Sequence, residues 1–600
     1  MFYSDDKKQY SVLNRRTFFL YLLKVSFFGI VGWRLYDIQI KDSKKYETLS
    51  KNNQIDIEII YPLRGKIYDT NNKVLASNIK VFDVYIIPEN TKNINKSLNE
   101  LNQIIKIDFS DRRKIIELSK KVKKFEKIKV LENISWTELE KIESNKLNIE
   151  GIFISQDYMR TYQHNNTVSH LIGYTNKPNR EEVELPFIAN MPNLEIGKVG
   201  IEKSFNPNLI GKSGQREIEV NSYGRVIREI SRKDSQKGND IQITIDLRIQ
   251  QYALNLLKEH KAGSAVLMDI NNGNILCMVS TPSYNPNKII QKPNNEYWNA
   301  ILENELSPLT YRCIQGLYAP GSTFKMIVAI AGIVHGVIDI DTKHFCSGKI
   351  GLGDRLYHCW KNNGHGSMNV SDAIKESCDV FFYEISKKIG IDKIAKVAQD
   401  FGLGKIYDVP LLNQKKGIIP SRDWKKKKYN ESWYPGETLI SAIGQGFVLT
   451  NPLQLAVMTS IIASNGKNVK PNIIKKNNYI EFEKLDKYLN AIKIIKSSMF
   501  KVVNETKGTA YNSRSDSVPF AGKTGTSQVR RITVAERESE DFRKKEVEWK
   551  KRDHALFVGY MPIEKPRYAV SVVIEHGGSG ASTAAPIAKE IFQFTKNLKT

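Results

Sequence analysis

Residues 320–325 read Pro-Gly-Ser-Thr-Phe-Lys and open a run of small and apolar residues that continues to residue 337. The run predicts a buried helix, in which positions i and i+3 share a face, so Lys325 can reach the hydroxyl of Ser322. The N-terminus of such a helix favours negative charge on the serine oxygen. A lysine can take a serine proton when burial or a neighbouring cation lowers its pKa. The stretch therefore predicts a nucleophilic serine with its base, although Ser-x-x-Lys alone recurs by chance in a lysine-rich chain.

Two further motifs follow the serine. The tripeptide Ser-Cys-Asp at 377–379 offers a second hydroxyl that could pass protons. The tetrapeptide Lys-Thr-Gly-Thr at 523–526 precedes strand-like residues. On a strand edge, it presents a cation and hydroxyls to a carboxylate, while its glycine lets a substrate approach closely. Each motif alone could be ordinary surface or capping residues, but the three in this order predict one catalytic constellation.

The segments on either side of these motifs read as strands. Residues 264–280 form two apolar runs separated by Asn-Asn-Gly at 271–273, which is typical of a β-hairpin. Residues 555–560 and 568–575 read as two further strands, and a helix over 583–598 follows them. Strands at both ends with helices between them predict one layered α/β domain of about 360 residues.

Residues 37–238 mix short strand-like and helix-like runs with many charges. Residues 61–69 read as a strand interrupted by an Arg-Gly pair, and residues 214–235 read as two strands joined at Gly224. The segment 197–202 lacks the third glycine of a dinucleotide loop, which argues against a phosphate cradle. We therefore expect a structural or docking domain in this region.

Residues 17–35 form an apolar segment of 19 residues, about 28 Å long as a helix and close to the roughly 30 Å of a bilayer core. The positive-inside rule keeps the preceding basic residues in the cytoplasm, namely Lys7, Lys8, Arg15 and Arg16. A cleaved signal peptide is the alternative, but no small-x-small cleavage site follows. We expect a cytoplasmic tail over 1–16, a permanent anchor over 17–36 and everything after it outside the cytoplasm.

The chain has 600 residues, of which 41% are hydrophobic, and a formal net charge of +25. Its length predicts two or more domains, and its hydrophobic content excludes a disordered chain. Five cysteines exclude a disulfide-dense scaffold. The charge alone would suit nucleic acid or an anionic membrane. A composition rich in lysine, isoleucine and asparagine throughout is the favoured explanation, and the charge alone decides nothing. The sequence has no zinc-finger, RNP or arginine-rich motif, so nucleic acid is not an expected partner.

These residues resemble the class B penicillin-binding proteins over most of the chain. The resemblance implies an α+β multi-domain fold with an N-terminal transmembrane helix, an elongated α/β pedestal (dimerisation-type) domain over 37–238 and a transpeptidase domain over 239–600, whose antiparallel sheet is sandwiched by helices. Asp379 departs from the commoner asparagine, as in elongation-specific members, and an ionised carboxylate only accepts hydrogen bonds. Further shared stretches are Arg64-Gly65 through Asp69, Gly200-x-Glu202, Gly224-Arg225, Gly444-Gln445-Gly446 and Asp553-His554-Ala555.

The resemblance also implies a function, that of a peptidoglycan D,D-transpeptidase acting in cell elongation (a serine-type D-Ala-D-Ala transpeptidase/carboxypeptidase). The serine would attack the penultimate D-Ala carbonyl of a stem peptide, and backbone N–H groups of Ser322 and Thr526 would hold the oxyanion. An acceptor amine of a second stem peptide would resolve the acyl-enzyme, and penicillins would trap it. The implied catalytic residues are Ser322, Lys325 (the base), Ser377, Asp379 and Lys523, with Ser377 and Lys523 relaying the proton to the leaving D-alanine; the implied substrate-binding residues are Thr524, Gly525 and Thr526.

The same resemblance implies partners and a location. The partners are peptidoglycan stem peptides, β-lactam antibiotics, and a polytopic SEDS-type glycosyltransferase with elongation-complex proteins. The location is the inner membrane, crossed once, with a cytoplasmic N-terminus and a periplasmic catalytic domain. No organic cofactor is expected.

Four soft metal ligands lie close together in the sequence: Cys346, Cys359, His365 and Cys378, separated by 12, 5 and 12 residues. Their donor atoms suit zinc, although no Cys-x-x-Cys pair is present. A disulfide in the oxidising periplasm and unlinked thiols are the alternatives. Some relatives look similar here and carry zinc, so the resemblance favours a structural Zn²⁺.

Two other functions remain compatible with the motifs. A membrane-tethered β-lactamase or β-lactam sensor would use the same serine and lysine residues. A lactamase does not need a domain of 200 residues before the motifs, and a sensor needs a cytoplasmic effector that a tail of 16 residues cannot supply. A non-catalytic scaffold that activates a glycosyltransferase is the third possibility.

Overall fold

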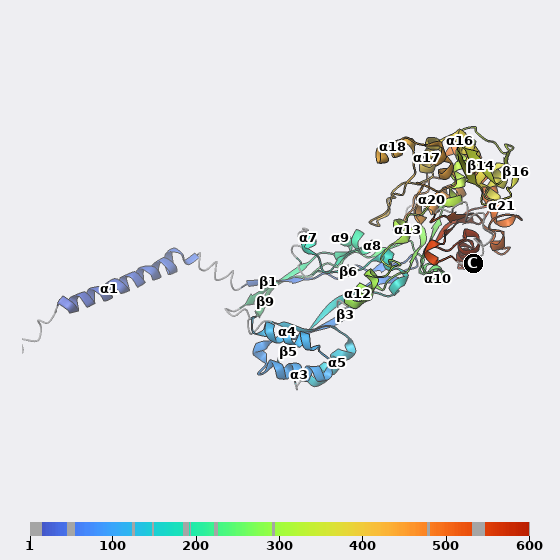
Figure 1. Ribbon diagram of the computed structural model, residues 1–600. Coiled ribbons are helices and arrows are strands. Elements are labelled where there is room, and N and C mark those ends of the chain that lie inside the picture. The colour runs from blue at the N-terminus through green and yellow to red at the C-terminus, as the bar shows by residue number, and fades with distance from the viewer. Residues whose placement is uncertain are drawn as a thin grey trace, which may run out of the picture. The chain divides into compact units, whose positions relative to one another are not determined.

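The computed structural model describes residues 15–44, 55–122, 127–146, 149–183, 191, 194–220, 226–290, 295–476, 481–530 and 547–598. The chain divides into two compact units, which are treated separately below. The first unit comprises Met1–Pro62, Val81–Asp157 and Lys212–Gln236. The second comprises Leu63–Lys80, Tyr158–Gly211 and Lys237–Thr600. Figure 1 shows their helices and strands along the chain.

The apolar N-terminal segment is helical. Helix α1 spans Arg15–Tyr36, and the π-helical turn η1 continues it over Asp37–Lys41. Within the described residues, the part from Phe18 to Lys41 is the one helix long and apolar enough to cross a membrane. Its apolar side chains are exposed; Phe19 and Trp33, for example, are 70% and 74% accessible. The prediction of an apolar helix long enough to span a bilayer is confirmed.

The first unit contains an antiparallel sheet in the order β1-β8-β9. Its strands are Ile55–Ile60, Gly214–Val220 and Val226–Lys233. Two strands in residues 214–235 are therefore confirmed, whereas Gly224, their expected junction, lies outside the described residues.

Three α-helices, one 3₁₀ turn, the strand β4 and parts of two longer strands complete the described part of the first unit. The strand β4 pairs with the end of β3, from Phe82 to Ile86. Buried Leu98, Leu101 and Ile142 from the helices join the same apolar core. The elements are α3 (Ile94–Ile104), α4 (Phe109–Ser119), α5 (Trp136–Asn145), β4 (Ile128–Ile134), η2 (Pro88–Asn90), and parts of β3 (Val74–Ile86) and β5 (Ile152–Tyr162).

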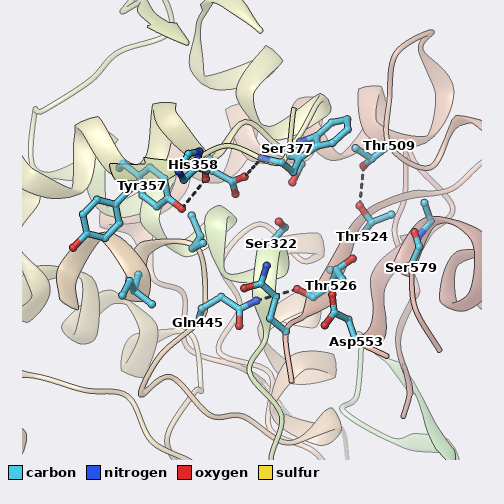
Figure 2. Close-up of a pocket in the computed structure, with 18 of the residues that line it drawn as sticks. Ser322, Tyr357, His358, Ser377, Gln445, Thr509, Thr524, Thr526, Asp553 and Ser579 are labelled. Carbon is cyan, nitrogen blue, oxygen red and sulfur yellow. Dashed lines mark hydrogen bonds between the residues drawn. The ribbon is translucent and has the colours of Figure 1, made fainter. Parts of the chain in front are cut away.

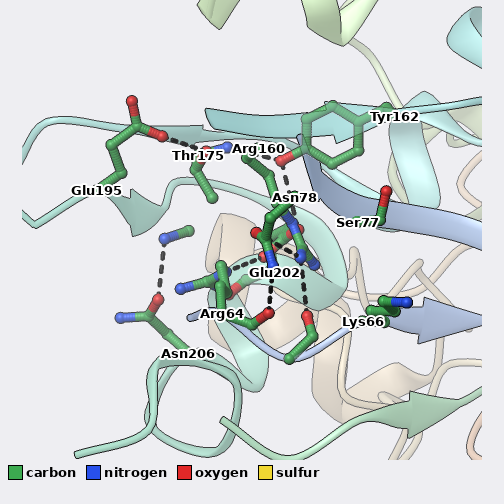
Figure 3. A network of polar contacts seen from close by, with 12 residues as sticks. Arg64, Lys66, Ser77, Asn78, Arg160, Tyr162, Thr175, Glu195, Glu202 and Asn206 are labelled. Atoms are coloured by element: carbon green, nitrogen blue, oxygen red, sulfur yellow. Dashed lines mark hydrogen bonds and ion pairs between the residues drawn. The ribbon is translucent and has the colours of Figure 1, made fainter. Parts of the chain in front are cut away.

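The N-terminal part of the second unit is built from short elements around buried charges. The elements are β2 (Ile67–Tyr68), η4 (Asn165–Thr167), α6 (Ser169–Ile172), β6 (Thr175–Asn176), α7 (Arg180–Val183), β7 (Ile196–Gly197), α8 (Gly200–Ser204), α9 (Asn206–Ile210) and β10 (Ile241–Gln242). Figure 3 shows the two guanidinium groups of Arg64 and Arg160 converging on Glu202. Their Nε atoms lie 2.6 and 2.7 Å from its carboxylate oxygens.

This charge network involves two of the stretches on which the resemblance to the penicillin-binding proteins rests. Glu202 is fully buried, and Arg64 and Arg160 are nearly so. Burial alone would raise the pKa of Glu202, but the two guanidinium groups outweigh burial and lower it. Arg64 also donates to the carbonyl of Glu202, and Arg160 to that of Gly65. These charge-assisted hydrogen bonds hold the Arg64-Gly65 pair and the Gly200-x-Glu202 stretch against each other.

The catalytic-motif region contains one five-stranded sheet in the order β12-β11-β19-β18-β17, with every neighbouring pair antiparallel. The strands are β11 (Gly263–Asp269), β12 (Ile275–Thr281), β17 (Ala521–Ser527), β18 (His554–Met561) and β19 (Tyr568–Ile574). The predicted hairpin at 264–280 and the two late strands are confirmed. All residues of β11, β12 and β19 are buried, so both faces of the sheet are covered.

Helices provide that cover. Helices α10 (Leu247–Leu257) and α23 (Ala585–Asn597) contact each other and the sheet, and α20 (Pro452–Ala463) packs on its central strands. The antiparallel sheet between helices, which the resemblance implies, is confirmed. Strand β17 carries the Lys-Thr-Gly-Thr motif and is the last strand of the sheet. Its outer edge is not paired with another strand of this sheet, so it can face the other two motifs.

The remaining elements surround this sheet. Helix α14 (Lys325–Val334) is the predicted buried helix, ending three residues earlier than expected. The others are α11 (Pro286–Ile290), α12 (Asn295–Leu302), α13 (Arg312–Gln315), η5 (Gly321–Phe324), β13 (His344–Cys346), β14 (Lys349–Leu352), β15 (Arg355–His358), β16 (Gly366–Met368), α15 (Val370–Lys375), α16 (Asp379–Ile389), α17 (Ile391–Asp400), α18 (Arg422–Tyr429), α19 (Pro435–Ala442), η6 (Asp486–Tyr488), α21 (Leu489–Asn504), η7 (Tyr511–Ser513), η9 (Trp549–Lys551) and η10 (Gly580–Ala584).

Candidate active site

Ser322 lies in a cavity of about 730 Å³. It is in the 3₁₀ turn η5 that leads directly into α14, so the serine is at the start of a buried helix as predicted. Figure 2 shows Ser322 between Ser377 on one side and Thr524 and Thr526 on the other. The cavity wall includes six of the eight residues expected for catalysis and substrate binding, namely Ser322, Ser377, Asp379, Thr524, Gly525 and Thr526.

Gly321 allows the serine turn to approach strand β17. Its φ is +53°, in the left-handed region that favours glycine. A Cβ atom at this position would lie 2.5 Å from the carbonyl oxygen of Thr526. Gly525 on β17 has the complementary role, because a Cβ there would lie 2.9 Å from the carbonyl oxygen of Pro320. Two glycines therefore bring the serine and the strand together.

Lys325 is completely buried beneath the cavity. Its ammonium donates to Oδ1 of Asp379 at 2.7 Å, to the carbonyl of Ser377 at 2.8 Å and to the hydroxyl of Ser377 at 3.2 Å. The sequence predicts that Lys325 reaches Ser322, whereas the hydrogen bonds found for its ammonium run to residues 377 and 379. Lys325 thus links the first two motifs electrostatically.

The Ser-x-Asp motif forms a strained connection between α15 and α16. Ser377 has a φ of +58°, which is unusual for a residue with a side chain. Asp379 begins α16, and its Oδ2 accepts the N–H of Trp360 at 2.8 Å. Burial raises the pKa of Asp379, against the opposing effect of the Lys325 ammonium. Both oxygens accept hydrogen bonds, as expected for a carboxylate at this position.

Lys523 is the second buried lysine of the site. Burial, together with the nearby Lys325 ammonium, lowers the pKa of Lys523 well below its ordinary value of 10.5, although Asp379 acts in the opposite direction. Its ammonium lies 3.1 Å from the carbonyl oxygen of Thr524. A buried amine with a lowered pKa can exchange protons near neutral pH.

Strand β17 presents its hydroxyls to the cavity. The hydroxyl of Thr524 lies 2.8 Å from that of Thr509, and Thr526 is exposed to the cavity. The side chain of Gln445 donates to the carbonyl oxygen of Thr526 at 3.0 Å (Figure 2). Thr509 has no sequence signal that would have marked it, and Gln445 belongs to a familiar stretch to which the sequence assigns no role.

The arrangement unites a nucleophile with proton-transfer groups and a recognition strand. Two buried lysines contact residues of the cavity wall, and the wall itself contains one carboxylate and the hydroxyl-bearing residues Ser322, Ser377, Thr524 and Thr526. Such a set can perform acyl transfer to and from the serine. All eight residues that the sequence singled out are gathered at this one place.

The cysteine and histidine residues form a separate cluster next to the Ser-x-Asp motif. One ligand atom from each of Cys346, Cys359, His365 and Cys378 lies within 4.8 Å of all the others. The sulfurs of Cys346 and Cys359 are 3.6 and 3.5 Å from Nδ1 of His365. None of the five cysteines, all of which are in the described residues, is in a disulfide. The structure thus brings together the four ligands that the sequence grouped.

Comparison with protein families matches two parts of the chain. Residues 263–593 match the model of the penicillin binding protein transpeptidase domain. Residues 59–243 match the penicillin-binding protein dimerisation domain. The first match alone covers more than half of the chain.

Relatives named as peptidoglycan D,D-transpeptidases match almost the whole chain. The peptidoglycan D,D-transpeptidase MrdA of Haemophilus influenzae is 32% identical over 99% of this chain and 93% of its own length. MrdA of Escherichia coli is 30% identical over 96% of this chain and 93% of its own length.

Solved structures show the same similarity. Penicillin-binding protein PBP2 of Helicobacter pylori, in its complex with MreC, superposes with a TM-score of 0.78 at 29% identity and covers 91% of this chain and 99% of its own. A chain from a peptidoglycan synthase complex that coordinates polymerization and crosslinking has a TM-score of 0.70 at 27% identity, with 96% and 97% coverage.

Proposed function

The chain belongs to the penicillin-binding protein 2 family of peptidoglycan D,D-transpeptidases, and we propose that it acts through a serine acyl-enzyme formed at Ser322. The observation that carries this proposal is the convergence of the three motifs on one cavity. The lactamase, sensor and scaffold alternatives are not favoured by these relatives.

The first half of the reaction uses the serine turn and strand β17. Ser322 Oγ attacks the penultimate D-Ala carbonyl of a donor stem peptide while the C–N bond to the last D-alanine breaks. The N–H groups of Ser322 and Thr526 stabilise the oxyanion. The hydroxyls of Thr524 and Thr526 hold the terminal carboxylate of the donor, and the glycine between them leaves room for close approach.

Buried groups of the site move the proton. Lys325 takes the proton of Ser322 in its neutral amine form, and the i, i+3 spacing on the serine turn lets its side chain reach the hydroxyl. Ser377, which lies 3.2 Å from the Lys325 ammonium, and Lys523 pass a proton to the amine of the departing D-alanine. The acceptor amine of a second stem peptide then attacks the ester carbonyl, forms the crosslink and returns Oγ to Ser322. Water in place of the amine gives carboxypeptidase activity.

Covalent labelling tests this proposal. The full chain is incubated with a labelled penicillin, and its intact mass is measured for wild type, Ser322→Ala and Ser367→Ala, the last an exposed serine of β16. A stable adduct on wild type and Ser367→Ala, absent from Ser322→Ala, is expected. Rapid turnover of penicillin would indicate a lactamase, and a wild type without adduct would leave a scaffold role.

We also propose a membrane setting for this activity. Helix α1 is the anchor, with its N-terminus in the cytoplasm and the catalytic region in the periplasm. Relatives are found with MreC and in a peptidoglycan synthase complex, which supports a polytopic glycosyltransferase and elongation-complex proteins as partners. Protease treatment of intact spheroplasts should digest the catalytic region and spare a tag at the N-terminus.

The cysteine–histidine cluster fits a structural zinc ion, which we propose as its occupant. In a tetrahedral site with Zn–S and Zn–N bonds of about 2.3 and 2.1 Å, neighbouring ligand atoms lie roughly 3.5–3.8 Å apart. The observed sulfur–nitrogen distances of 3.6 and 3.5 Å agree with this spacing. Cys346, Cys359, His365 and Cys378 would hold the ion as a closed four-ligand site. It would supply a rigid cross-link, and because Cys378 lies between Ser377 and Asp379, that link would steady the second motif.

Elemental analysis after dialysis tests for the metal. It should find one zinc per chain, and Cys346→Ser should lose it; a wild type without zinc would contradict the proposal.

A further inference from the structure

The cavity around Ser322 continues beyond Thr526 along the sheet. In the antiparallel register of β17 and β18, Ser527 pairs with His554. One step further places Gln528 opposite Asp553. Alternate residues of a strand share a face, and so do cross-strand partners. Thr524, Thr526, Gln528 and Asp553 accordingly all line the cavity.

Asp553 is at the end of this row. Figure 2 shows Thr524, Thr526 and Asp553 one after another along the same wall. Two residues of a strand span about 7 Å, so the Asp553 carboxylate is roughly one dipeptide beyond the oxyanion position at Thr526. Ser322 faces the middle of the row.

The Asp553 carboxylate has no ion-pair partner among the residues that the structure describes. Its Oδ1 accepts one hydrogen bond, from the N–H of Val529 at 3.3 Å. Burial raises its pKa, opposed by that hydrogen bond and by the more distant charges of Arg530 and His576. A half-buried carboxylate in the wall of a substrate cavity is stabilised when a cation arrives with the substrate. The catalytic mechanism proposed above gives this carboxylate no role.

The direction of the donor peptide follows from the proposed function, on which this inference rests. Its terminal carboxylate lies at Thr524 and its reacting carbonyl at Thr526. A peptide extended along the free edge of β17 advances about 3.4 Å per residue. The residue before the D-Ala-D-Ala pair therefore begins one residue beyond Thr526, and a long side chain on it covers the remaining distance to Gln528 and Asp553.

The chemistry of crosslinking supplies the cation. Each crosslink joins the acyl group of one stem peptide to a side-chain amine of another. When both peptides are of the same kind, the donor carries that amine as well, and it is protonated near neutral pH. We propose that Asp553 binds the side-chain ammonium of a diamino acid that immediately precedes D-Ala-D-Ala in the donor. Asp553 is thus a specificity-determining residue for the donor.

A pair of donor peptides tests this assignment. The probes are Nα-acetyl-L-lysyl-D-alanyl-D-alanine and the same peptide with its side-chain amine also acetylated. Release of D-alanine is measured with the full chain in detergent, for wild type, Asp553→Asn and Asp553→Glu. Asp516→Asn, at an exposed aspartate, is the matched control.

The expected readout is the ratio of kcat/KM for the two donors. Wild type and Asp516→Asn should prefer the free amine by tenfold or more, because a charge-assisted pair contributes that much discrimination. Asp553→Asn should bring the ratio close to one, and Asp553→Glu should restore part of it. A merely structural role would slow both donors equally and leave the ratio unchanged.

Three results would overturn the assignment. The first is a wild type that does not distinguish the two donors. The second is an equal fall of kcat/KM for both donors in Asp553→Asn. The third is a preference for the donor with the free amine that appears only when a labelled D-amino acid is the acceptor, and is absent when water is the acceptor. Failure of the proposed function is distinguishable from all three, because the wild type would then also form no adduct with labelled penicillin.

Discussion

The ammonium of Lys325 lies 2.7 Å from Oδ1 of Asp379, and both side chains are buried. This ion pair joins the helix that carries the nucleophile to the turn that carries Ser377. It also places one negative charge between two lysines, since Lys523 is close enough to affect the same groups. The three side chains therefore form one coupled buried cluster, and changing any one of them should disturb the other two.

Removing the carboxylate of Asp379 should impair acylation. Asp379→Asn leaves the buried Lys325 ammonium without its counter-charge and should lower the rate of penicillin acylation at least tenfold. Asp372→Asn, at a partly exposed aspartate of α15, provides the control. Stopped-flow measurement with a fluorescent penicillin would give both rates. Equal rates for Asp379→Asn and wild type would show that the ion pair is dispensable.

The glycine at the serine turn should be essential for a steric reason. Gly321→Ala would place a methyl group 2.5 Å from the Thr526 carbonyl and force the serine away from β17, so penicillin acylation should fall at least tenfold. Gly336 has a similar φ of +67° but open space around it. Gly336→Ala therefore carries the backbone strain alone, about 1–2 kcal/mol, and should acylate like wild type. Similar rates for the two variants would contradict the steric argument.

The buried charges around Glu202 should contribute strongly to stability. Glu202→Gln leaves two buried guanidinium groups without their counter-ion and should lower the free energy of unfolding by about 3–5 kcal/mol. Glu117→Gln breaks an exposed i, i+4 pair with Arg113 and should cost only about 0.5 kcal/mol or less. Urea unfolding followed by circular dichroism would compare them. A loss below 1 kcal/mol for Glu202→Gln would show that the network is not a stabilising feature.

The lowered pKa of Lys523 makes stability depend on pH. Between its lowered pKa in the folded protein and 10.5 in the unfolded chain, the unfolded state binds more protons, so stability rises with pH in that interval. Lys523→Met removes this contribution. The increase in Tm from pH 7 to pH 10 should therefore be smaller in Lys523→Met than in wild type and in the exposed variant Lys393→Met. Identical pH dependence in all three proteins would exclude a strongly perturbed Lys523.

The hydroxyl of Thr509 should support the recognition strand. Thr509→Val removes the group that lies 2.8 Å from the Thr524 hydroxyl. Loss of one hydrogen bond of about 0.5–1.5 kcal/mol should slow penicillin acylation roughly three- to tenfold. Thr342→Val, in an exposed loop, should acylate at the wild-type rate. An unchanged rate in Thr509→Val would mean that Thr524 is positioned without it.

Local patterns in the sequence predicted much of this structure. The hairpin at 264–280 follows from its apolar runs and Asn-Gly turn, and helix α14 follows from its run of small apolar residues. The order of the three motifs predicted a single site, and the structure places their residues around one cavity.

Contacts between distant segments could not be predicted in the same way. Spacing alone placed Lys325 beneath Ser322, but its ion pair with Asp379 depends on how α14 packs beside α16. The pairing of Thr509 with Thr524 depends on a loop with no motif. Asp553 was visible only as part of a familiar stretch, and its place in the cavity follows from the register of β17 and β18.

The central claim is that Ser322 transfers an acyl group from a D-Ala-D-Ala donor to an amine. The most direct measurement is the exchange of the terminal D-alanine of a donor peptide for an isotopically labelled D-amino acid, followed by mass spectrometry. The full wild-type chain should form the exchanged peptide, and Ser322→Ala should form none. Exchange by Ser322→Ala at the wild-type rate, or a wild type that yields no exchanged peptide while still releasing D-alanine, would contradict the account.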